Sequence, residues 1–443
     1  MRPHYLWITA GCILALFGMR PISSSGAPPA GREKAIYSFQ GGTDGAAPMS
    51  DLTLDSAGNL YGTTSQGGTG TCGGCGTVFE LKRSQDGWKE EVLYSFGAYQ
   101  GDGVYPQAGL IFDSAGNLYG TTIEGLGDNS ADGTVFKLSP NGHGGWTERV
   151  IYSFPPDQSA GANPSTDLVF DSHGNLYGTA SIGGGNANSC YGSGCGTVFK
   201  LTPQSDGSWR ETTVHIFTDT GGDGAYPSSG FVLDSAGNLY GLTKSGGTGS
   251  CQIRSNGSPT VFGCGTLYEL ILNSDEAPNV IALYNFVPGG GFGIYPSSGI
   301  CFDNQSHLLG TTQRGGDGFG TVFELQDTKE KGWQQNEAHI FDGIPDGAGP
   351  VGRLTTDANG DLFGATSSGA TFTKGLGTVF EVQHAKNDWS EKILHSFAGS
   401  PDGATPSAGL ISDSRGHLYG TTLYGGTGTG CVHGCGTVYQ VTP

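Results

Sequence analysis

Internal repetition constrains this chain more strongly than any other feature of its sequence. A segment of the form Pro-x-x-Gly-Leu-Ile-x-Asp-Ser-x-Gly-Asn-Leu-Tyr-Gly-Thr-Thr, a glycine-rich stretch and Gly-Thr-Val-Phe-x-Leu recur in this order seven times. The Gly-Thr segments begin at Gly76, Gly133, Gly196, Gly265, Gly320, Gly377 and Gly436. An aromatic strand accompanies each unit and ends at Phe39, Phe96, Phe154, Phe217, Phe286, Phe341 and Phe397. Seven copies occupy Tyr37 to Pro443 and leave no room for a second domain.

Each unit is predicted to form four short strands, as the second unit illustrates. Its first strand is Gly109–Phe112, followed by the turn Asp113–Asn117, whose Gly and Asn suit a tight hairpin. The second and third strands are Leu118–Thr122 and Thr134–Leu138, and the fourth runs from Trp146 to Phe154. No stretch shows a helical period over ten residues, so the chain is predicted to be all-β.

The fourth strand carries Trp and Phe eight residues apart in five units, as in Trp146 and Phe154. Because an even separation places two side chains on the same strand face, we expect both rings to share one face. That face packs on the neighbouring sheet, or alternatively forms an aromatic platform for a ligand.

The ends of the repeat distinguish a ring from a linear stack. A strand of the fourth type, Ala35–Phe39, comes first, whereas the chain stops after a third-type strand, Gly436–Val441. In a ring this spare strand completes the last sheet and leaves no exposed edge. We therefore predict a seven-bladed β-propeller of four-stranded antiparallel blades over residues 35–443, closed by the N-terminal strand.

The N-terminal segment is typical of a secretory signal peptide. An apolar run from Tyr5 to Met19 lies between two arginines and precedes small residues and proline, Ser23–Ala30. Residues 1–30 are thus expected to be signal and linker, and the protein to be secreted, extracellular or on the cell surface. Lipidation at Cys12 is an alternative. The run is too short to span a bilayer, and no second one follows, so no transmembrane anchor is predicted.

Composition excludes two classes of partner. The 81 glycines suggest disorder, but 22 Phe, 18 Tyr and 6 Trp supply enough apolar surface for a core. With 21 basic against 40 acidic residues, the formal net charge is −19. Such a chain lacks the basic patch that binds nucleic acids or anionic membrane surfaces, so neither partner is expected. We expect a monomer.

The paired motifs Gly-Asn-Leu-Tyr-Gly-Thr-Thr and Gly-Thr-Val-Phe resemble the GloVer tandem repeat of bacterial exported proteins, the "choice-of-anchor" group. The resemblance covers all seven units and implies a secreted or surface protein without an assigned biochemical role. It carries over no catalytic residues. The chain ends at Pro443 without the group's sorting helix, which leaves surface retention open. The units resemble NHL-type and kelch-type blades more distantly.

The loops are predicted to divide between the two ends of the ring. Turns within the first and second hairpins are short, as in Ser114–Asn117, whereas the glycine-rich loops between second and third strands and the connections between units are long. We call the end with the long loops the long-loop face. Binding residues usually lie on the longer loops of a rigid scaffold, so a ligand site is expected there.

Candidate ligand-binding residues follow from this placement. Five aspartates precede a glycine in the connections, namely Asp44, Asp102, Asp223, Asp346 and Asp402. One interpretation is that they surround the channel mouth and hold Ca²⁺ or a hydroxyl-rich ligand. The alternative is that each Asp-Gly pair only forms a turn, in which the aspartate caps the backbone and the glycine adopts a positive φ. Three tyrosines directly precede the prolines that open a unit. They are expected either to stack on sugar rings or to pack between blades, and they are Tyr105, Tyr226 and Tyr295. The insertion Ser250–Gly263, with Arg254, is a further candidate.

Eight cysteines form local pairs, Cys72/Cys75, Cys190/Cys195, Cys251/Cys264 and Cys431/Cys435. In an exported protein this pattern favours disulfides that restrain glycine-rich loops. Two Cys₄ zinc sites are the alternative.

Two functions fit the sequence. The first is a non-enzymatic, disulfide-braced binding scaffold for a protein or glycan on the long-loop face. The second is a carbohydrate- or lactone-directed hydrolase or lyase with a channel-mouth carboxylate pair or Ca²⁺. No catalytic residue and no resident cofactor are predicted, since no nucleophile–base motif occurs.

Overall fold

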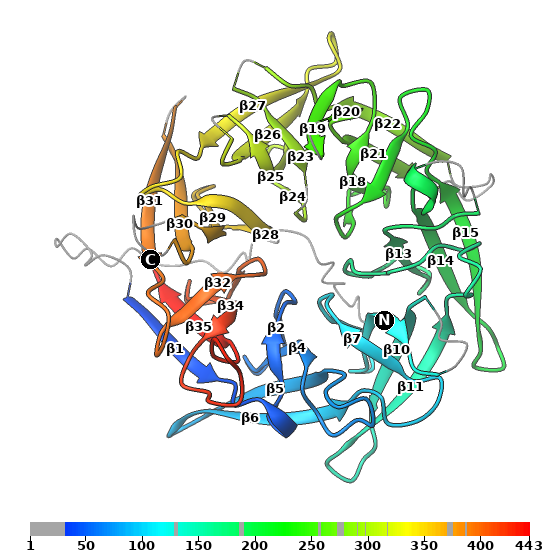
Figure 1. Cartoon of the computed structure of the whole chain (residues 1–443), viewed down its shortest axis with the longest axis vertical. Coiled ribbons are helices and arrows are strands. Elements are labelled where there is room, and N and C mark those ends of the chain that lie inside the picture. The colour runs from blue at the N-terminus through cyan, green and yellow to red at the C-terminus, as the bar shows by residue number, and fades with distance from the viewer. Residues whose placement is uncertain are drawn as a thin grey trace, which may run out of the picture.

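The computed structural model describes residues 32–443 apart from 128–131, 186–189, 256–257, 273–278, 290, 297, 317, 370–374 and 386–387. The predicted seven-bladed β-propeller is confirmed: seven antiparallel sheets surround a central channel (Figure 1). The predicted signal peptide, with Cys12, lies outside the described residues.

The first three blades show the common plan, from the channel outwards. The first contains β2 (Ala46–Pro48), β3 (Thr53–Leu54), β4 (Leu60–Gln66), β5 (Thr77–Ser84) and β6 (Gly87–Ser95). The second contains β7 (Gly103–Pro106), β8 (Ile111–Phe112), β9 (Leu118–Gly125), β10 (Thr134–Pro140) and β11 (Trp146–Ser153). The third contains β12 (Val169–Phe170), β13 (Leu176–Ala180), β14 (Thr197–Pro203) and β15 (Trp209–Ile216).

The remaining blades repeat this plan. The fourth contains β16 (Gly224–Pro227), β17 (Val232–Leu233), β18 (Leu239–Gly246), β21 (Thr266–Ile271) and β22 (Asn279–Asn285), with the inserted hairpin β19 (Cys251–Ser255) and β20 (Ser258–Phe262). The fifth contains β23 (Gly293–Pro296), β24 (Cys301–Phe302), β25 (Leu308–Gly315), β26 (Thr321–Asp327) and β27 (Trp333–Ile340). The sixth contains β28 (Ala348–Thr356), β29 (Leu362–Ser368), β30 (Thr378–Ala385) and β31 (Asp388–Ser396). The seventh contains β32 (Gly403–Pro406), β33 (Ile411–Ser412), β34 (Leu418–Gly425), β35 (Thr437–Thr442) and β1 (Arg32–Ser38).

The N-terminal strand closes the ring as predicted. β1 pairs antiparallel with β35, from Arg32 opposite Thr442 to Ser38 opposite Thr437, and lies beside it in Figure 1. Every blade therefore has its outer strand, and no sheet edge is exposed at the seam.

The innermost strand differs from the prediction of one strand at Gly109–Phe112. It consists of two short pieces that pair with opposite halves of the second strand, β7 with Gly125 to Thr122 and β8 with Tyr119 and Leu118. The residues after Pro106 leave the ladder before β8 begins at Ile111; Pro106 still pairs with Thr122 but has no amide hydrogen to donate. Each blade thus projects one bulge into the channel.

The Leu-Tyr-Gly-Thr-Thr motif has a packing reason. A Cβ on Gly120 would lie 2.7 Å from Cζ of Phe136, so only glycine leaves room for the ring of the third strand. The hydroxyls of Thr122 and Thr134, both buried, lie 2.7 Å apart and join the second and third strands. These contacts explain why the motif pairs with Gly-Thr-Val-Phe.

The prediction that Trp and Phe of the fourth strand share one face was wrong. A β-bulge in β11 shifts the register between Val135 and Phe136, so the alternation changes side between the two aromatics. Trp88 packs on Tyr419 of the preceding blade, whereas Phe96 packs on Phe136 of the following blade. Both faces of the fourth strand therefore contribute to the cores between blades.

Adjacent blades are joined by the glycine of Gly-Thr and the proline of the next unit. At the seam, a Cβ on Gly436 would lie 2.5 Å from Cδ of Pro48, and the amide of Ala47 donates to the carbonyl of Cys435 at 2.9 Å. Only two 3-10 helices, η1 (Gly42–Asp44) and η2 (Cys190–Gly192), occur in the described part of the chain. Neither is long enough to cross a membrane.

Candidate functional site

The long-loop face is braced by four disulfides, which confirms the predicted pairing in place of the alternative zinc sites. The bonds are Cys72–Cys75, Cys190–Cys195, Cys251–Cys264 and Cys431–Cys435. Their Cα atoms lie 5.2 to 5.9 Å apart, within the usual range for the bond.

The second cysteine of each pair does more than restrain a loop, which is all that the sequence predicted. Cys195 and Cys264 are fully buried, in the cores that join the third blade to the fourth and the fourth to the fifth. Their carbonyls accept hydrogen bonds from the amides of Tyr226 at 2.8 Å and Tyr295 at 3.0 Å, both in the next blade. These disulfides thus tie a loop residue to a buried position between two blades.

A cavity of about 390 Å³ opens on this face between the seventh and first blades. Its walls are mainly backbone, because seven of the twelve residues that line it are glycine. Cys72, Cys431 and Tyr105 contribute side chains to the lining. Backbone amides and carbonyls at such a surface suit a polar ligand or an extended peptide.

Most of the large exposed apolar side chains lie at the same end of the molecule. Seven of the eight large exposed hydrophobic residues among those described lie in the long loops or at strand ends that lead into them, namely Tyr99, Ile216, Val287, Phe319, Ile344, Tyr424 and Val432. The eighth, Ile281, lies within β22. Val432, 94% exposed, is held at the tip of the Cys431–Cys435 loop. The described short turns at the opposite end contain none of them.

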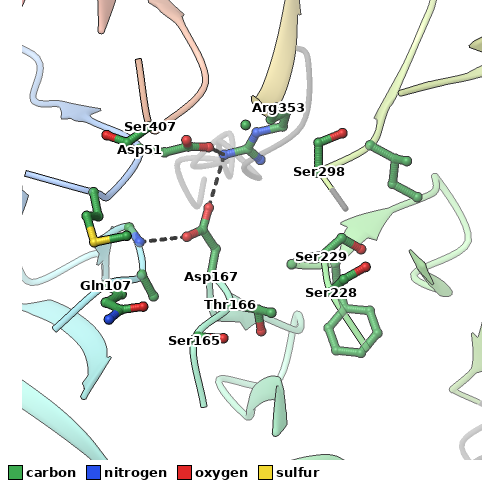
Figure 2. A pocket seen from close by; sticks show the side chains of 18 residues that line it. Asp51, Gln107, Ser165, Thr166, Asp167, Ser228, Ser229, Ser298, Arg353 and Ser407 are labelled. Carbon is green, nitrogen blue, oxygen red and sulfur yellow. Dashed lines mark hydrogen bonds and ion pairs between the residues drawn. The ribbon is translucent and has the colours of Figure 1, made fainter. Parts of the chain in front are cut away.

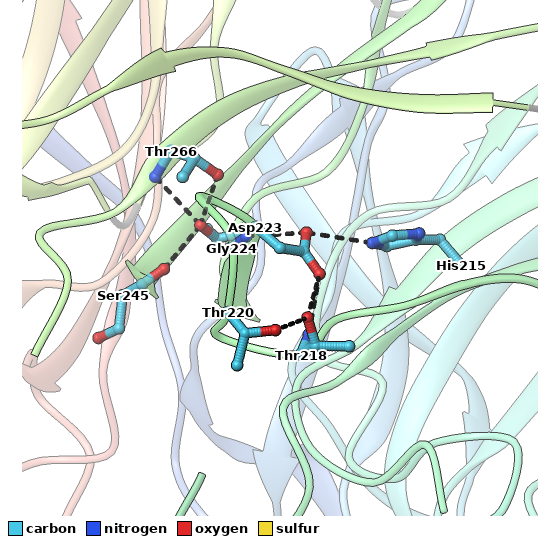
Figure 3. Close-up of polar contacts among 8 residues, drawn as sticks. His215, Thr218, Thr220, Asp223, Gly224, Ser245 and Thr266 are labelled. Atoms are coloured by element: carbon cyan, nitrogen blue, oxygen red, sulfur yellow. Dashed lines mark hydrogen bonds and ion pairs between the residues drawn. The ribbon is translucent and has the colours of Figure 1, made fainter. Parts of the chain in front are cut away.

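The five predicted aspartates do not surround the channel cavity. Each lies beside the Tyr or His two residues before the Phe that ends the preceding fourth strand. Figure 3 shows Asp223, which accepts hydrogen bonds from the amides of Thr218 and Gly224, at 2.9 Å each, and contacts Nε2 of His215 at 3.2 Å. Asp102 is fully buried and accepts from Tyr94, Ala98 and Gly103. Whether these residues bind a ligand or Ca²⁺ stays a prediction.

At these contacts the pKa of the aspartate and the pKa of the neighbouring glutamate shift in opposite directions. Burial raises the pKa of Asp402, but hydrogen bonds from His395 and from the amides of Ala398 and Gly403 outweigh it and hold the pKa below its usual value. A glutamate on the next outer strand lies close by, and burial together with the charge of Asp402 raises the pKa of Glu33 to about 7. Equivalent burial raises the pKa of Glu90, Glu148 and Glu391 to about 7 as well.

We call each such group of Tyr or His, Asp and Glu a rim clasp, since it joins two blades at the outer end of the connection. In two of the clasps with histidine, ligand atoms for a divalent ion lie within 4.8 Å of one another, as in Glu33, His395 and Asp402. Tyr94 and Asp102 make the same contact through a hydroxyl instead. This common arrangement favours a joining role for the clasps.

The tyrosines that precede the prolines have different surroundings. Tyr105 lines the cavity on the long-loop face, and the hydroxyl of Tyr226 donates to the carbonyl of Cys190 at 2.9 Å. Tyr295 is buried in the core between the fourth and fifth blades. All three adopt a positive φ of 57 to 59°, which turns the chain into the channel bulge. Arg254 belongs to β19, and its side chain lies outside the described residues.

The channel holds a group of charged residues that sequence reasoning missed. Asp51, Asp167 and Arg353 stand where four other blades have the glycine of Pro-x-x-Gly. Figure 2 shows the guanidinium between the two carboxylates, with Nη2 3.8 Å from Asp51 and 3.5 Å from Asp167. Each carboxylate also accepts a backbone amide, from Gly409 at 2.6 Å and from Gly109 at 2.7 Å.

These residues line a cavity of about 150 Å³, together with serine hydroxyls from several blades. Their side chains are 20 to 27% exposed, so the group reaches solvent through the channel. Burial and the charge of Asp167 raise the pKa of Asp51 to about 6, against the opposing effects of Arg353 and the amide of Gly409. The single guanidinium of Arg353 therefore does not fully neutralise the two carboxylates.

A family model, described as the Gloeobacter/Verrucomicrobia repeat, matches residues 25–254 and 251–443. The chain belongs to this repeat family. The match confirms the resemblance to the GloVer repeat and spans the strands of all seven blades. No curated protein matches the sequence.

Three solved structures are similar to this repeat-family member. The extracellular domain of a putative hybrid two-component system from B. thetaiotaomicron shares its fold, being 13% identical with a TM-score of 0.52, over 91% of this chain and 39% of that one. A putative oxidoreductase (glucose dehydrogenase) from Thermus thermophilus is 12% identical with a TM-score of 0.43, over 93% and 100%. A luciferin-regenerating enzyme is 14% identical with a TM-score of 0.40, over 76% and 90%. The chain thus spans 39% of the length of the first of these proteins.

The missed channel residues had a signal in the family repeat itself. Aligning the seven Pro-x-x-Gly segments shows Asp51, Asp167 and Arg353 at the glycine position. The sequence alone did not indicate that this position faces the channel, because the bulge between the two inner strand pieces was not predicted. Charged residues in place of a repeated glycine are the feature that would have found the site.

Proposed function

We propose that this member of the repeat family is an exported, non-enzymatic scaffold that binds a protein or glycan ligand on its long-loop face. The observation that carries the proposal is that seven of the eight large exposed apolar side chains among the described residues lie at that end of the ring. Exposed apolar and aromatic side chains on the loops of a rigid scaffold are the kind that anchor a partner at an interface. Disulfides and a solved extracellular domain of the same fold support a location outside the cytoplasm.

The cavity between the seventh and first blades gives the proposed surface a centre. Val432 follows Cys431, which lines the cavity, and the ring of Tyr424 packs against His433 with 5.9 Å between centroids. An apolar tip beside a cavity of backbone donors and acceptors suits a ligand with both apolar and hydroxyl or amide groups. The disulfide reduces the entropy that such a tip loses on binding.

The test is a glycan array and a panel of purified surface proteins, probed with the chain and with matched variants. Tyr424→Ser and Val432→Ser should each weaken binding about tenfold or more, as expected for anchors at an interface. Ile281→Ser is the control, because that side chain is 38% exposed but lies within an outer strand. Equal binding by all three variants contradicts the proposed face.

A second candidate is the carbohydrate- or lactone-directed hydrolase or lyase, and the channel carboxylates favour it. Asp51 and Asp167 lie on opposite sides of Arg353, and the pKa of Asp51 is raised towards neutrality, as for a general acid. Turnover of a glycoside or lactone that disappears in Asp51→Asn would establish this function and contradict the non-enzymatic one.

A further inference from the structure

The disulfides of the long-loop face differ in how far solvent reaches them. Both cysteines are buried in Cys190–Cys195 and in Cys251–Cys264, with an exposure of 9% at most. In the first blade, by contrast, Cys75 is fully buried but Cys72 is exposed. We propose that the Cys72–Cys75 disulfide exchanges with a thiol, carried by a small molecule or by a cysteine of a partner protein. The proposal goes beyond the proposed function and does not depend on it.

The difference in exposure sets the direction of the exchange. A thiolate attacks one sulfur of a disulfide and displaces the other. Because Cys72 is the accessible cysteine of this pair, the incoming sulfur bonds to Sγ of Cys72 while the bond between Cys72 and Cys75 breaks. The electron pair of the broken bond stays on Sγ of Cys75, which takes up one proton, equal to the one that the incoming thiol lost. The products are a mixed disulfide on Cys72 and a thiol at Cys75.

The ring that this disulfide closes is the shortest of the four. Cys72 and Cys75 are 3 positions apart, against 13 for Cys251–Cys264, and a cross-link that closes a shorter loop stabilises the chain less. The residues between them are Gly73 and Gly74, both with positive φ, so the opened loop regains much conformational freedom. This freedom disfavours the return of the Cys75 thiol to the mixed disulfide. An exposed disulfide in such a loop is of the labile kind.

The rest of the first blade does not have to move when the bond opens. The carbonyl of Cys75 accepts the amide of Tyr105 at 2.7 Å, and its side chain belongs to the core between the first and second blades. Before the loop, the amide of Thr71 donates to the carbonyl of Gly97 at 2.9 Å. The exchange therefore changes the segment between these two fixed points and leaves the strands in place.

The cavity beside Cys72 lets a thiolate approach. It measures about 390 Å³, and Cys72 and Cys431 line it together with seven glycines. Apart from the cysteines, Tyr105 is the only ionisable side chain among the described residues of this lining. No carboxylate of the lining therefore repels an incoming thiolate, although the whole chain carries a formal net charge of −19.

The experiment incubates the whole chain, with its disulfides formed, at pH 8 with reduced glutathione or with a peptide that carries one cysteine. N-ethylmaleimide stops the exchange by capping free thiols, and tandem mass spectrometry locates each adduct. We expect the added thiol on Cys72 and maleimide on Cys75, at least about tenfold faster than any product at Cys190–Cys195 or Cys251–Cys264. A faster reaction of the peptide identifies a protein cysteine as the preferred source of the thiol, and any other order identifies a small molecule.

Two matched variants test access, because both lose the same bond. Cys75→Ser leaves the exposed thiol of Cys72, which should take up one glutathione from oxidised glutathione. Cys72→Ser leaves only the buried thiol of Cys75 and should take up at least about tenfold less. If either variant does not fold, the adducts of the unaltered chain remain the test. The proposal is overturned if the unaltered chain forms no adduct, if the adduct lies on Cys75, or if the buried disulfides react as fast.

Discussion

The rim clasps and the channel bulges are built from the same seven repeats, but the contacts of the clasps recur from blade to blade, whereas the key residue of the bulge does not. At the rim, Tyr94 with Asp102 and His395 with Asp402 make equivalent contacts in different blades. At the channel, the glycine of the bulge remains in four blades and is replaced in the other three by Asp51, Asp167 and Arg353. Positions that repeat hold blades together, whereas positions that depart from the repeat give the ring its particular chemistry.

Steric crowding explains how the departures are arranged. Around the ring, no two replaced positions are neighbours, so each charged side chain lies between two glycines. A Cβ on Gly109 would lie 2.8 Å from Oδ1 of Asp167, and one on Gly230 would lie 2.9 Å from Cβ of the same residue. A side chain in one bulge therefore requires glycine in the next.

The largest expected effect comes from breaking this alternation. In Gly409→Ala the new Cβ would lie 2.4 Å from the carbonyl oxygen of Arg353, so we expect the free energy of unfolding to fall by about 3 kcal/mol. Denaturant unfolding measures the loss. Gly416→Ala is the control, because it has a positive φ but open space around it and should cost only about 1 kcal/mol. Similar losses in the two variants would mean that crowding at the channel does not matter.

The rim should respond to loss of a single clasp by a smaller amount. Asp102→Ala removes the acceptor for the hydroxyl of Tyr94 and for two backbone amides in a fully buried place. We expect thermal unfolding to show a loss of about 2 kcal/mol, since buried donors are left unpaired. Asp86→Ala, at an exposed turn, should be neutral. A neutral Asp102→Ala would contradict the joining role of the clasps.

The contrast also shows what sequence reasoning could reach. The fold followed from repetition, and the closure by β1 followed from the spare strand at Ala35–Phe39, because both are consequences of counting strands. The disulfide pairs followed from local spacing, although the burial of Cys195 and Cys264 between blades did not. The features that were reached depend on residues that are close in the sequence or identical in every unit.

Features that depend on three-dimensional register were not reached. The bulge in β11 reversed the expected side of Trp and Phe, because one extra residue changes the alternation of all that follow. The Asp-Gly residues were expected at the channel mouth but lie at the rim, since the connection ends beside the preceding outer strand. The channel group joins blades one, three and six, which no local pattern brings together.

At the channel, removing the positive charge of Arg353 should lower the free energy of unfolding less than the steric crowding in Gly409→Ala does. Arg353→Gln leaves two carboxylates facing each other, so we expect the free energy of unfolding at pH 8 to fall by about 1.5 kcal/mol, limited by the partial exposure of all three side chains. Loss of Arg353 should also raise the pKa of Asp51, which lessens the defect at pH 5. The double variant with Asp51→Asn should recover most of the stability, and a loss that adds instead would show that the pair does not interact.

The smallest effect concerns the glutamate of a rim clasp and has the opposite sign. Burial, with the charges of Asp44 and Glu91, raises the pKa of Glu90 from 4.5 to about 7. The folded state therefore binds the proton more tightly than the unfolded state, so stability is highest below pH 4.5 for this group and decreases as the pH rises to 7. Glu90→Gln should flatten that decrease and raise the free energy of unfolding at pH 8 by about 0.5 to 1 kcal/mol. Asp86→Asn should leave the pH profile unchanged. Melting temperatures between pH 5 and 8 measure both, and a destabilised Glu90→Gln at pH 8 would mean that the ionised carboxylate holds the clasp together.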